Sequence, residues 1–253
     1  MKEVLIEKRD RDTQAKSMYV QILGATSLPE SPSQFPDTFQ LPKEPSQTFH
    51  DLRMATAQSG NELCALISVS RNRFKNQLIY GDQEGVGQPD YKEIGRVFFG
   101  QKPLIDYHTH PVGKNSFVGL VDLHYFMSTP RGAYMFGVGT DIGYWLFAQS
   151  QAAMKLPLLY SWRRLHTLYS IRDALTHVNT HSKERGNTAD EKASQMIEGI
   201  ILSLKNSGLA TYFCPDPYGN MPPNAESLLF TLFMPEDSQI KLTPQQRRNI
   251  LRV

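Results

Sequence analysis

Two histidines one residue apart close an apolar run in the stretch IDYHTHP, residues 105–111. Residues i and i+2 of a β-strand point to the same side, so His108 and His110 are predicted to aim their imidazoles at one point just past the end of a strand. Imidazoles are common metal ligands, and a catalytic zinc usually has three protein ligands with water in the fourth position. A third ligand is therefore expected elsewhere in the chain.

Asp122 is the best candidate for this third ligand. It follows the His-Thr-His-Pro segment after a short loop. It also falls in the first turn of a helix predicted over residues 121–128, where the positive end of the helix dipole favours a carboxylate. The predicted centre therefore holds Zn²⁺ between His108, His110 and Asp122.

A hydrolytic zinc site also needs a general base that is not a ligand, because the proton of the attacking water has to be accepted and passed to the leaving group. Glu62 stands at the start of the apolar segment 62–70, which is predicted to be a buried strand. A carboxylate at such a strand end is well placed for this role. Spacing alone does not separate Glu62 from Glu84 or Glu93.

The elements before the site are predicted from composition and proline content. Residues 17–28 have the composition of a strand, and the five prolines between positions 29 and 45 predict an extended arm. Ser46 is expected to cap the N-terminus of a short helix that ends near Gly60.

Alternating or continuous apolar runs predict further strands, and helical spacing predicts further helices. The strands are expected at 62–70, 73–81, 103–111, 133–140, 142–150 and 227–233. The helices are expected at 90–99 and 121–128, around 165–178, between Thr188 and Gly208, and at 243–253.

These elements predict an α/β fold, in which a curved mixed β-sheet is flanked by helices. The expected organisation has three parts. They are an N-terminal strand with a proline-rich arm (1–45), a catalytic core (46–160) and a helical C-terminal extension packed on that core (161–253).

Composition limits the partners and the compartment. Lys and Arg total 27 against 25 for Asp and Glu, a net charge of +2 that favours neither nucleic acid nor an acidic membrane as a partner. Cys64 and Cys214 form no CxxC pair, which suggests a reduced intracellular environment. With no predicted signal peptide and no apolar run of about 18 residues, the sequence predicts a soluble cytoplasmic protein.

The order Glu62, then His108-x-His110-Pro111, then a spacer and Asp122 resembles the motif of the JAMM (MPN-domain) zinc metalloproteases. The resemblance implies an MPN-type, cytidine-deaminase-like sheet and the zinc-dependent hydrolysis of peptide or isopeptide bonds. It implies a protein substrate, with ubiquitin or ubiquitin-like conjugates the common ones in the family, and Glu62 as the base.

The resemblance covers roughly residues 46–150, and one position departs from it. The family has a serine three residues before the aspartate, where this chain has Gly119. In the family that hydroxyl supports the water and the developing oxyanion, and the loss of one such donor costs about 10²- to 10³-fold in rate. Ser116 and Asn115 are the nearest side chains that could partly replace it.

Two other functions are compatible with parts of the pattern. Asp106, His108 and His110 also fit the Asp-x-His-x-His motif of amidohydrolase barrels, although too little chain follows His110 to complete a (β/α)₈ barrel. Alternatively, MPN domains that have lost catalysis act as scaffolds or binding modules, and Gly119 could be a step in that direction.

Overall fold

The computed structural model describes residues 2–81, 103–111, 118–119, 122, 133–155, 189–215 and 227–233. The helices predicted at 90–99, around 165–178 and at 243–253 lie outside these residues, as does the helix at 121–128 apart from Asp122.

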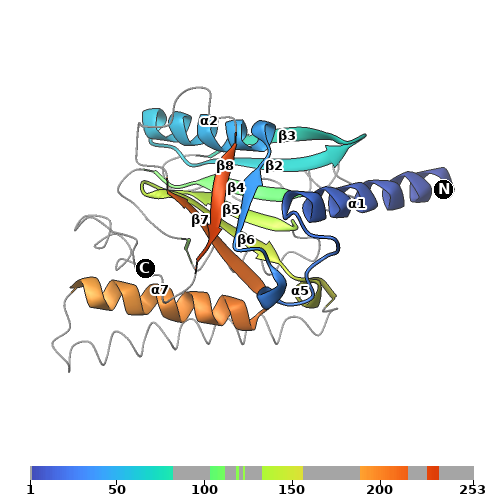
Figure 1. Cartoon of the computed structure of the whole chain (residues 1–253). Coiled ribbons are helices and arrows are strands. Elements are labelled where there is room, and N and C mark those ends of the chain that lie inside the picture. The colour runs from blue at the N-terminus through green and yellow to red at the C-terminus, as the bar shows by residue number, and fades with distance from the viewer. Residues whose placement is uncertain are drawn as a thin grey trace.

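One curled, mixed sheet of eight strands carries the described part of the chain (Figure 1). Its strand order is β1-β8-β7-β6-β5-β4-β2-β3, and the β4–β5 pair is parallel while the other pairs are antiparallel. The strands are β1 (Thr38–Leu41), β2 (Leu63–Ser70), β3 (Arg73–Tyr80), β4 (Ile105–Thr109), β5 (Met135–Gly139), β6 (Gly143–Gln149), β7 (Leu209–Pro215) and β8 (Leu228–Leu232).

Helices flank this sheet. They are α1 (Lys2–Ile22), the short 3₁₀ turn η1 (Pro32–Gln34), α2 (Lys43–Ser59), α5 (Gln151–Lys155) and α7 (Ala189–Asn206). Helices α1 and α2 pack on β2, and α2 also contacts β4, whereas α7 packs on β7 and α5 on β6. The predicted α/β class with a curved mixed sheet is confirmed.

The strand predicted over residues 17–28 is wrong, because residues 17–22 belong to α1 and residues 23–28 form no strand. The side chains of Ala15, Tyr19 and Ile22 are buried at helical spacing. Tyr19 is fully buried and donates a hydrogen bond to the carbonyl of Gln149 at 2.8 Å. The β-like composition of the segment was misleading. Its buried positions are three to four residues apart, which is the period of a helix, and their burial determines the structure.

Helix α2 begins at Lys43, three residues before the predicted cap Ser46. The Ser46 hydroxyl does not cap the helix. It donates to the carbonyl of Leu41 at 2.9 Å and accepts the backbone N–H of Leu228 at 3.0 Å, so it joins the start of α2 to β8. The predicted end is confirmed, because Gly60 follows the helix in the left-handed conformation, with φ of +73°.

The sheet takes strands from all three predicted parts of the chain. The strand expected at 227–233 is confirmed as β8, while β7 was not predicted. Both strands lie inside the sheet, so the expectation of a helical C-terminal part has to be corrected at β7. The helix predicted before Gly208 is confirmed as α7, and Gly208 has φ of +87°.

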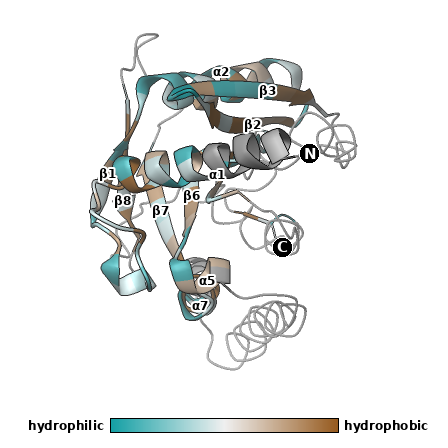
Figure 2. Ribbon diagram, turned by 90° about the vertical axis from the view of Figure 1, so that its right-hand side faces the viewer, coloured by the Kyte–Doolittle hydropathy of each residue, from teal (hydrophilic) through white to brown (hydrophobic). Residues whose placement is uncertain are grey.

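The face of the sheet beneath α1 and α2 forms the main hydrophobic core. Strand β2 is buried along almost its whole length, and Figure 2 colours much of it as hydrophobic. Tyr107 of β4 stacks on Phe49 of α2 with 3.7 Å between ring centroids, and it donates a hydrogen bond to the Phe49 carbonyl at 3.1 Å. Side chains alternate along a strand, so His108 must point to the opposite face. Core packing at Tyr107 thus fixes the direction in which the first histidine points.

Thr109, between the two histidines, hydrogen-bonds the end of β4 to β2 and to α2. Its fully buried hydroxyl accepts the backbone N–H of Leu63 at 3.1 Å and lies 3.2 Å from the Leu63 carbonyl, and it also hydrogen-bonds the hydroxyl of Thr56. These bonds continue the β2–β4 ladder one residue beyond the Cys64–His108 pair. They fix the first residue of β2, and hence its neighbour Glu62, relative to the histidines.

We expect Thr109→Val to destabilise the metal-free protein by about 1–3 kcal/mol, because valine keeps the shape but leaves buried backbone groups of Leu63 without a partner. Urea unfolding of the wild type, Thr109→Val and Thr109→Ser measures this. Serine keeps the hydroxyl and should restore most of the loss. Equal unfolding midpoints for wild type and valine would contradict the assigned role of the hydroxyl.

Candidate metal centre

The end of β4 presents both histidines on one side of the sheet. His108 is the penultimate residue of β4 and pairs with Cys64 of β2 and with Val138 of β5. His110 lies just beyond the strand, and its backbone N–H donates to the carbonyl of Gly139 at 2.8 Å, which fixes its main chain to β5. Both side chains are buried, with 10 % and 4 % of their surface exposed.

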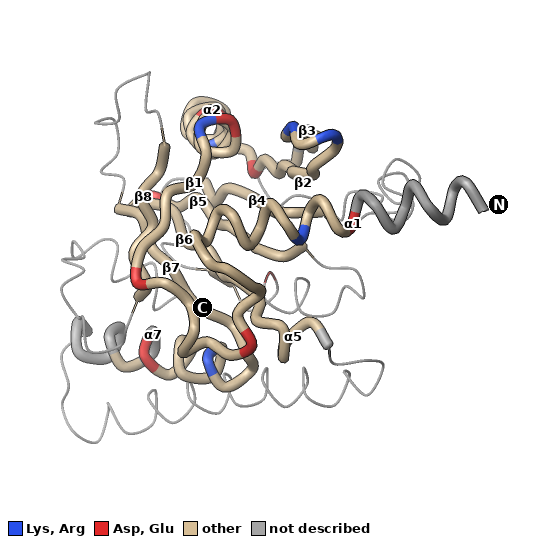
Figure 3. Tube along the Cα trace, turned by 45° about the vertical axis from the view of Figure 1, so that its right-hand side comes forward, with Lys and Arg blue, Asp and Glu red and all other residues tan. Residues whose placement is uncertain are grey.

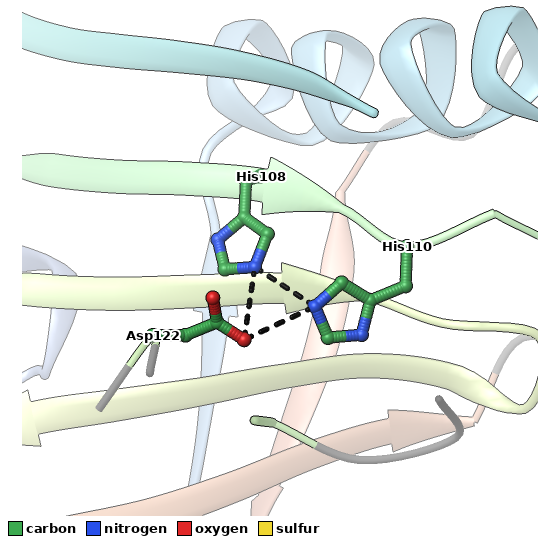
Figure 4. A group of neighbouring side chains, drawn as sticks. All are labelled: His108, His110 and Asp122. Carbon is green, nitrogen blue, oxygen red and sulfur yellow. Dashed lines mark hydrogen bonds and ion pairs between the residues drawn. The ribbon is translucent and has the colours of Figure 1, made fainter. Parts of the chain in front are cut away.

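Asp122 reaches the same point, and Figure 4 shows its carboxylate and the two imidazoles directed toward one another. The Nε2 atoms of His108 and His110 are 3.0 Å apart. Oδ2 of Asp122 is 3.2 Å from Nε2 of His110 and 3.6 Å from Nε2 of His108. The structure therefore brings together all three predicted ligands.

These spacings fit a tetrahedral metal ion. Zinc bonds of about 2.0–2.2 Å place the ligand atoms of a tetrahedron about 3.3–3.6 Å from one another. The three observed separations, 3.0, 3.2 and 3.6 Å, lie within a few tenths of an ångström of that range. One ion equidistant from the three atoms would be coordinated with little movement of any side chain, so the group can hold a metal ion.

Glu62 lies beside this group, directly before the first residue of the neighbouring strand β2. The antiparallel register that pairs Cys64 with His108 continues to Glu62 opposite His110, which puts both side chains on the same face. Glu62 is half-buried, and its charge contributes to raising the pKa of His108, as expected for a close neighbour. The predicted base and the predicted ligands thus occupy one end of one sheet face.

The charges of the histidines and of the aspartate shift one another's pKa values. Burial lowers the pKa of His108, but the Asp122 carboxylate and the charges of Glu62 and Asp106 outweigh that effect and raise it above its ordinary value. Burial likewise raises the pKa of Asp122, but His108 and His110 outweigh it and lower that pKa. The two histidines therefore favour the ionised form of Asp122, which is the form that binds a metal ion.

A buried acid and thiol, Asp106 and Cys64, lie next to His108. Asp106 was considered only as part of the alternative amidohydrolase motif, and Cys64 was not expected in the site. Asp106 is 8 % exposed and accepts a hydrogen bond from the Cys64 thiol at 3.7 Å. Burial raises the pKa of Asp106 to about 6, with Asp122 adding to the rise, while His108 and the Cys64 bond oppose it. Burial, followed by the nearby Asp106, raises the pKa of Cys64 well above its usual range. The alternation of the strand is the signal that could have placed Asp106 on the histidine face.

Gly119, at the position of the family's serine, donates its backbone N–H to Oδ2 of Asp122 at 2.9 Å. This contact has the form of a capping box, in which an acidic side chain reaches back to the backbone three residues earlier. Ser116 and Asn115, the suggested substitutes for the serine, lie outside the described residues.

Metal affinity should rise with pH, because His108 has to lose its proton to bind a metal and its pKa is raised in the metal-free protein. Asp122 is already ionised and adds no pH dependence. Below the His108 pKa we expect about a tenfold gain in apparent zinc affinity per pH unit, measured by competition with a chromophoric chelator between about pH 5.5 and 8.5. An affinity that does not change over this range would contradict the prediction.

Charged residues elsewhere in the described part of the chain are scattered along the trace in Figure 3. None of the described helices combines the length and the apolar character needed to cross a membrane. Comparisons of the chain with protein-family models, with curated proteins and with solved structures found no match.

Proposed function

We propose that this protein is a zinc-dependent metalloprotease of the JAMM type that hydrolyses peptide or isopeptide bonds. The observation that carries the proposal is the convergence of two imidazoles and a carboxylate within 3.0–3.6 Å, with a separate carboxylate directly before the adjacent strand. A scaffold has no chemical need for this combination. A general base beside a three-ligand centre is what metal-assisted hydrolysis requires.

Zinc is the ion that suits these ligands best. Two neutral imidazoles and one carboxylate favour a borderline metal, whereas magnesium and calcium prefer sites made of oxygen ligands. The buried histidines are close to tetrahedral spacing. The fourth side of the site would then be open to substrate and water.

The roles of the residues follow from their positions. His108, His110 and Asp122 would hold the ion, which when bound polarises a carbonyl and acidifies water. Glu62 would accept a proton from the water as its oxygen bonds to the carbonyl carbon, and would then deliver that proton to the amine nitrogen as the amide C–N bond breaks. Thr109 keeps this carboxylate in register with the ligands through Leu63.

The proposed fold is of the MPN type. Three features support it: a curled mixed sheet, a His-x-His pair at the end of an interior strand, and a glutamate directly before the antiparallel neighbour of that strand. The amidohydrolase barrel is less well supported, because the described strands are mostly antiparallel whereas that barrel is built of parallel strands. Ubiquitin-like conjugates as substrates, and a cytoplasmic location, are proposed from the resemblance and the composition.

A second candidate function is a metal-binding scaffold with little or no turnover. Gly119 favours it, because the hydroxyl that supports the oxyanion in the family is missing at this position. Ser116 or Asn115 could restore part of that support. If so, alanine at both positions should lower turnover, and unchanged turnover would remove them from the site.

The zinc-loaded protein should be incubated with a panel of ubiquitin-like conjugates and with unstructured peptides, before and after chelation. Metalloprotease activity predicts cleavage of at least one class, loss of cleavage with the chelator and recovery when zinc is added back. A folded protein with one zinc per chain that cuts no member of the panel would favour the scaffold instead.

A further inference from the structure

We propose that Gly119 is a positioning residue of the metal centre: its missing side chain provides the space in which the Asp122 carboxylate reaches the two histidines. This inference rests on the proposed metal-binding function. It predicts that the serine typical of the family would weaken this particular centre. Gly119 would then be required for metal binding in this chain, in addition to lacking the hydroxyl of the family's serine.

A single oxygen atom links Gly119 to the ligands. Oδ2 of Asp122 accepts the Gly119 backbone N–H at 2.9 Å and lies 3.2 Å and 3.6 Å from the two imidazole nitrogens. The backbone of Gly119 therefore holds the atom of Asp122 that lies nearest the predicted metal position. The Asp122 side chain is 27 % exposed, and among the described residues this bond and the two histidines orient its carboxylate.

Any side chain at position 119 would meet the same atom. A Cβ added to Gly119 would lie 2.7 Å from Oδ2 of Asp122 and 3.5 Å from its Cγ. A carbon and an oxygen at 2.7 Å overlap, so one of them has to move. The carboxylate is the end of a rotatable side chain, and its rotation would relieve the overlap while leaving the fold intact. The centre would then lose the position of its third ligand.

The backbone gives no other reason for glycine at this position. Gly24, Gly60, Gly143 and Gly208 have positive φ angles, but Gly119 does not. A residue with a side chain can therefore adopt the conformation of Gly119. The close approach of Asp122 is what excludes a side chain.

The test compares Gly119→Ala and Gly119→Ser with the wild type, using zinc affinity from chelator competition and the absorption spectrum of the cobalt-substituted protein. We expect both variants to fold and to bind zinc about 10- to 100-fold more weakly, as for other residues that orient a metal ligand. The cobalt spectrum should change as the third ligand moves. In the Asp122→Ala background, the same substitutions should cause no further loss of affinity, because the ligand that they displace is absent.

Zinc affinity and cobalt spectra equal to the wild type in both variants would overturn the inference and leave the proposed function standing. A serine variant that binds zinc more tightly than the alanine variant and as tightly as the wild type would show that the hydroxyl matters more than the overlap, which also overturns it. If the wild type binds no zinc, the proposed function fails. Crystal structures of the metal-free variants then decide the inference, because an Asp122 carboxylate that stays in place beside a new Cβ refutes it.

Discussion

Glu62→Gln is expected to lower turnover of any cleaved conjugate by about 10²- to 10⁴-fold while leaving one zinc per chain. Glutamine has nearly the same shape but cannot accept the proton of the attacking water. The half-buried Glu62 faces the histidines without belonging to the group of three ligand atoms, so the metal should be retained. Turnover at saturating substrate measures the expected loss of activity, and the zinc content of the same sample shows whether the metal is retained.

Matched variants distinguish Glu62 from the other acids that the sequence left open. Glu84→Gln and Glu93→Gln make the same chemical change at positions outside the described residues, and Glu44→Gln makes it on the exposed start of α2. If the first two keep full turnover, the base is assigned to Glu62. Full turnover in Glu62→Gln, or a comparable loss in Glu84→Gln, would transfer the role to another residue.

The candidate site was more predictable from sequence than the complete fold. The two-residue period of a strand was enough to put His108 and His110 on one face, and the motif spacing was enough to bring in Asp122. Both signals are local or nearly so. The Cys64–Asp106 contact joins two strands and depends on their register, which no local pattern determines.

The errors in the predicted fold have the same physical origin. Residues 17–28 have apolar and β-branched side chains that suit a strand, but burial of Ala15 and Tyr19 against the sheet selects the helix. Ser46 has the residue type of a helix cap, but it is used to bond Leu41 and Leu228, which are distant in sequence from one another. In each case a tertiary contact outweighed a local preference.

Zinc should stabilise the wild type strongly and should leave His108→Ala almost unaffected. A ligand that binds only the folded state adds about 4 kcal/mol at a free concentration of a thousand times its Kd. For a chain of this length that corresponds to a rise in Tm on the order of 10 °C. His108→Ala removes one of the three ligand atoms, so added zinc should raise its Tm by little, as measured by thermal unfolding with and without the metal.

His50→Ala is the matched control, because His50 lies on α2 next to Phe49, on the face of the sheet away from His108. Its response to zinc should equal that of the wild type, although its Tm without metal can differ. A zinc-dependent rise that survives in His108→Ala but disappears in His50→Ala would place the metal on the other face of the sheet. Such a result would remove the basis for hydrolysis, because Glu62 and Asp122 would then no longer adjoin the ion.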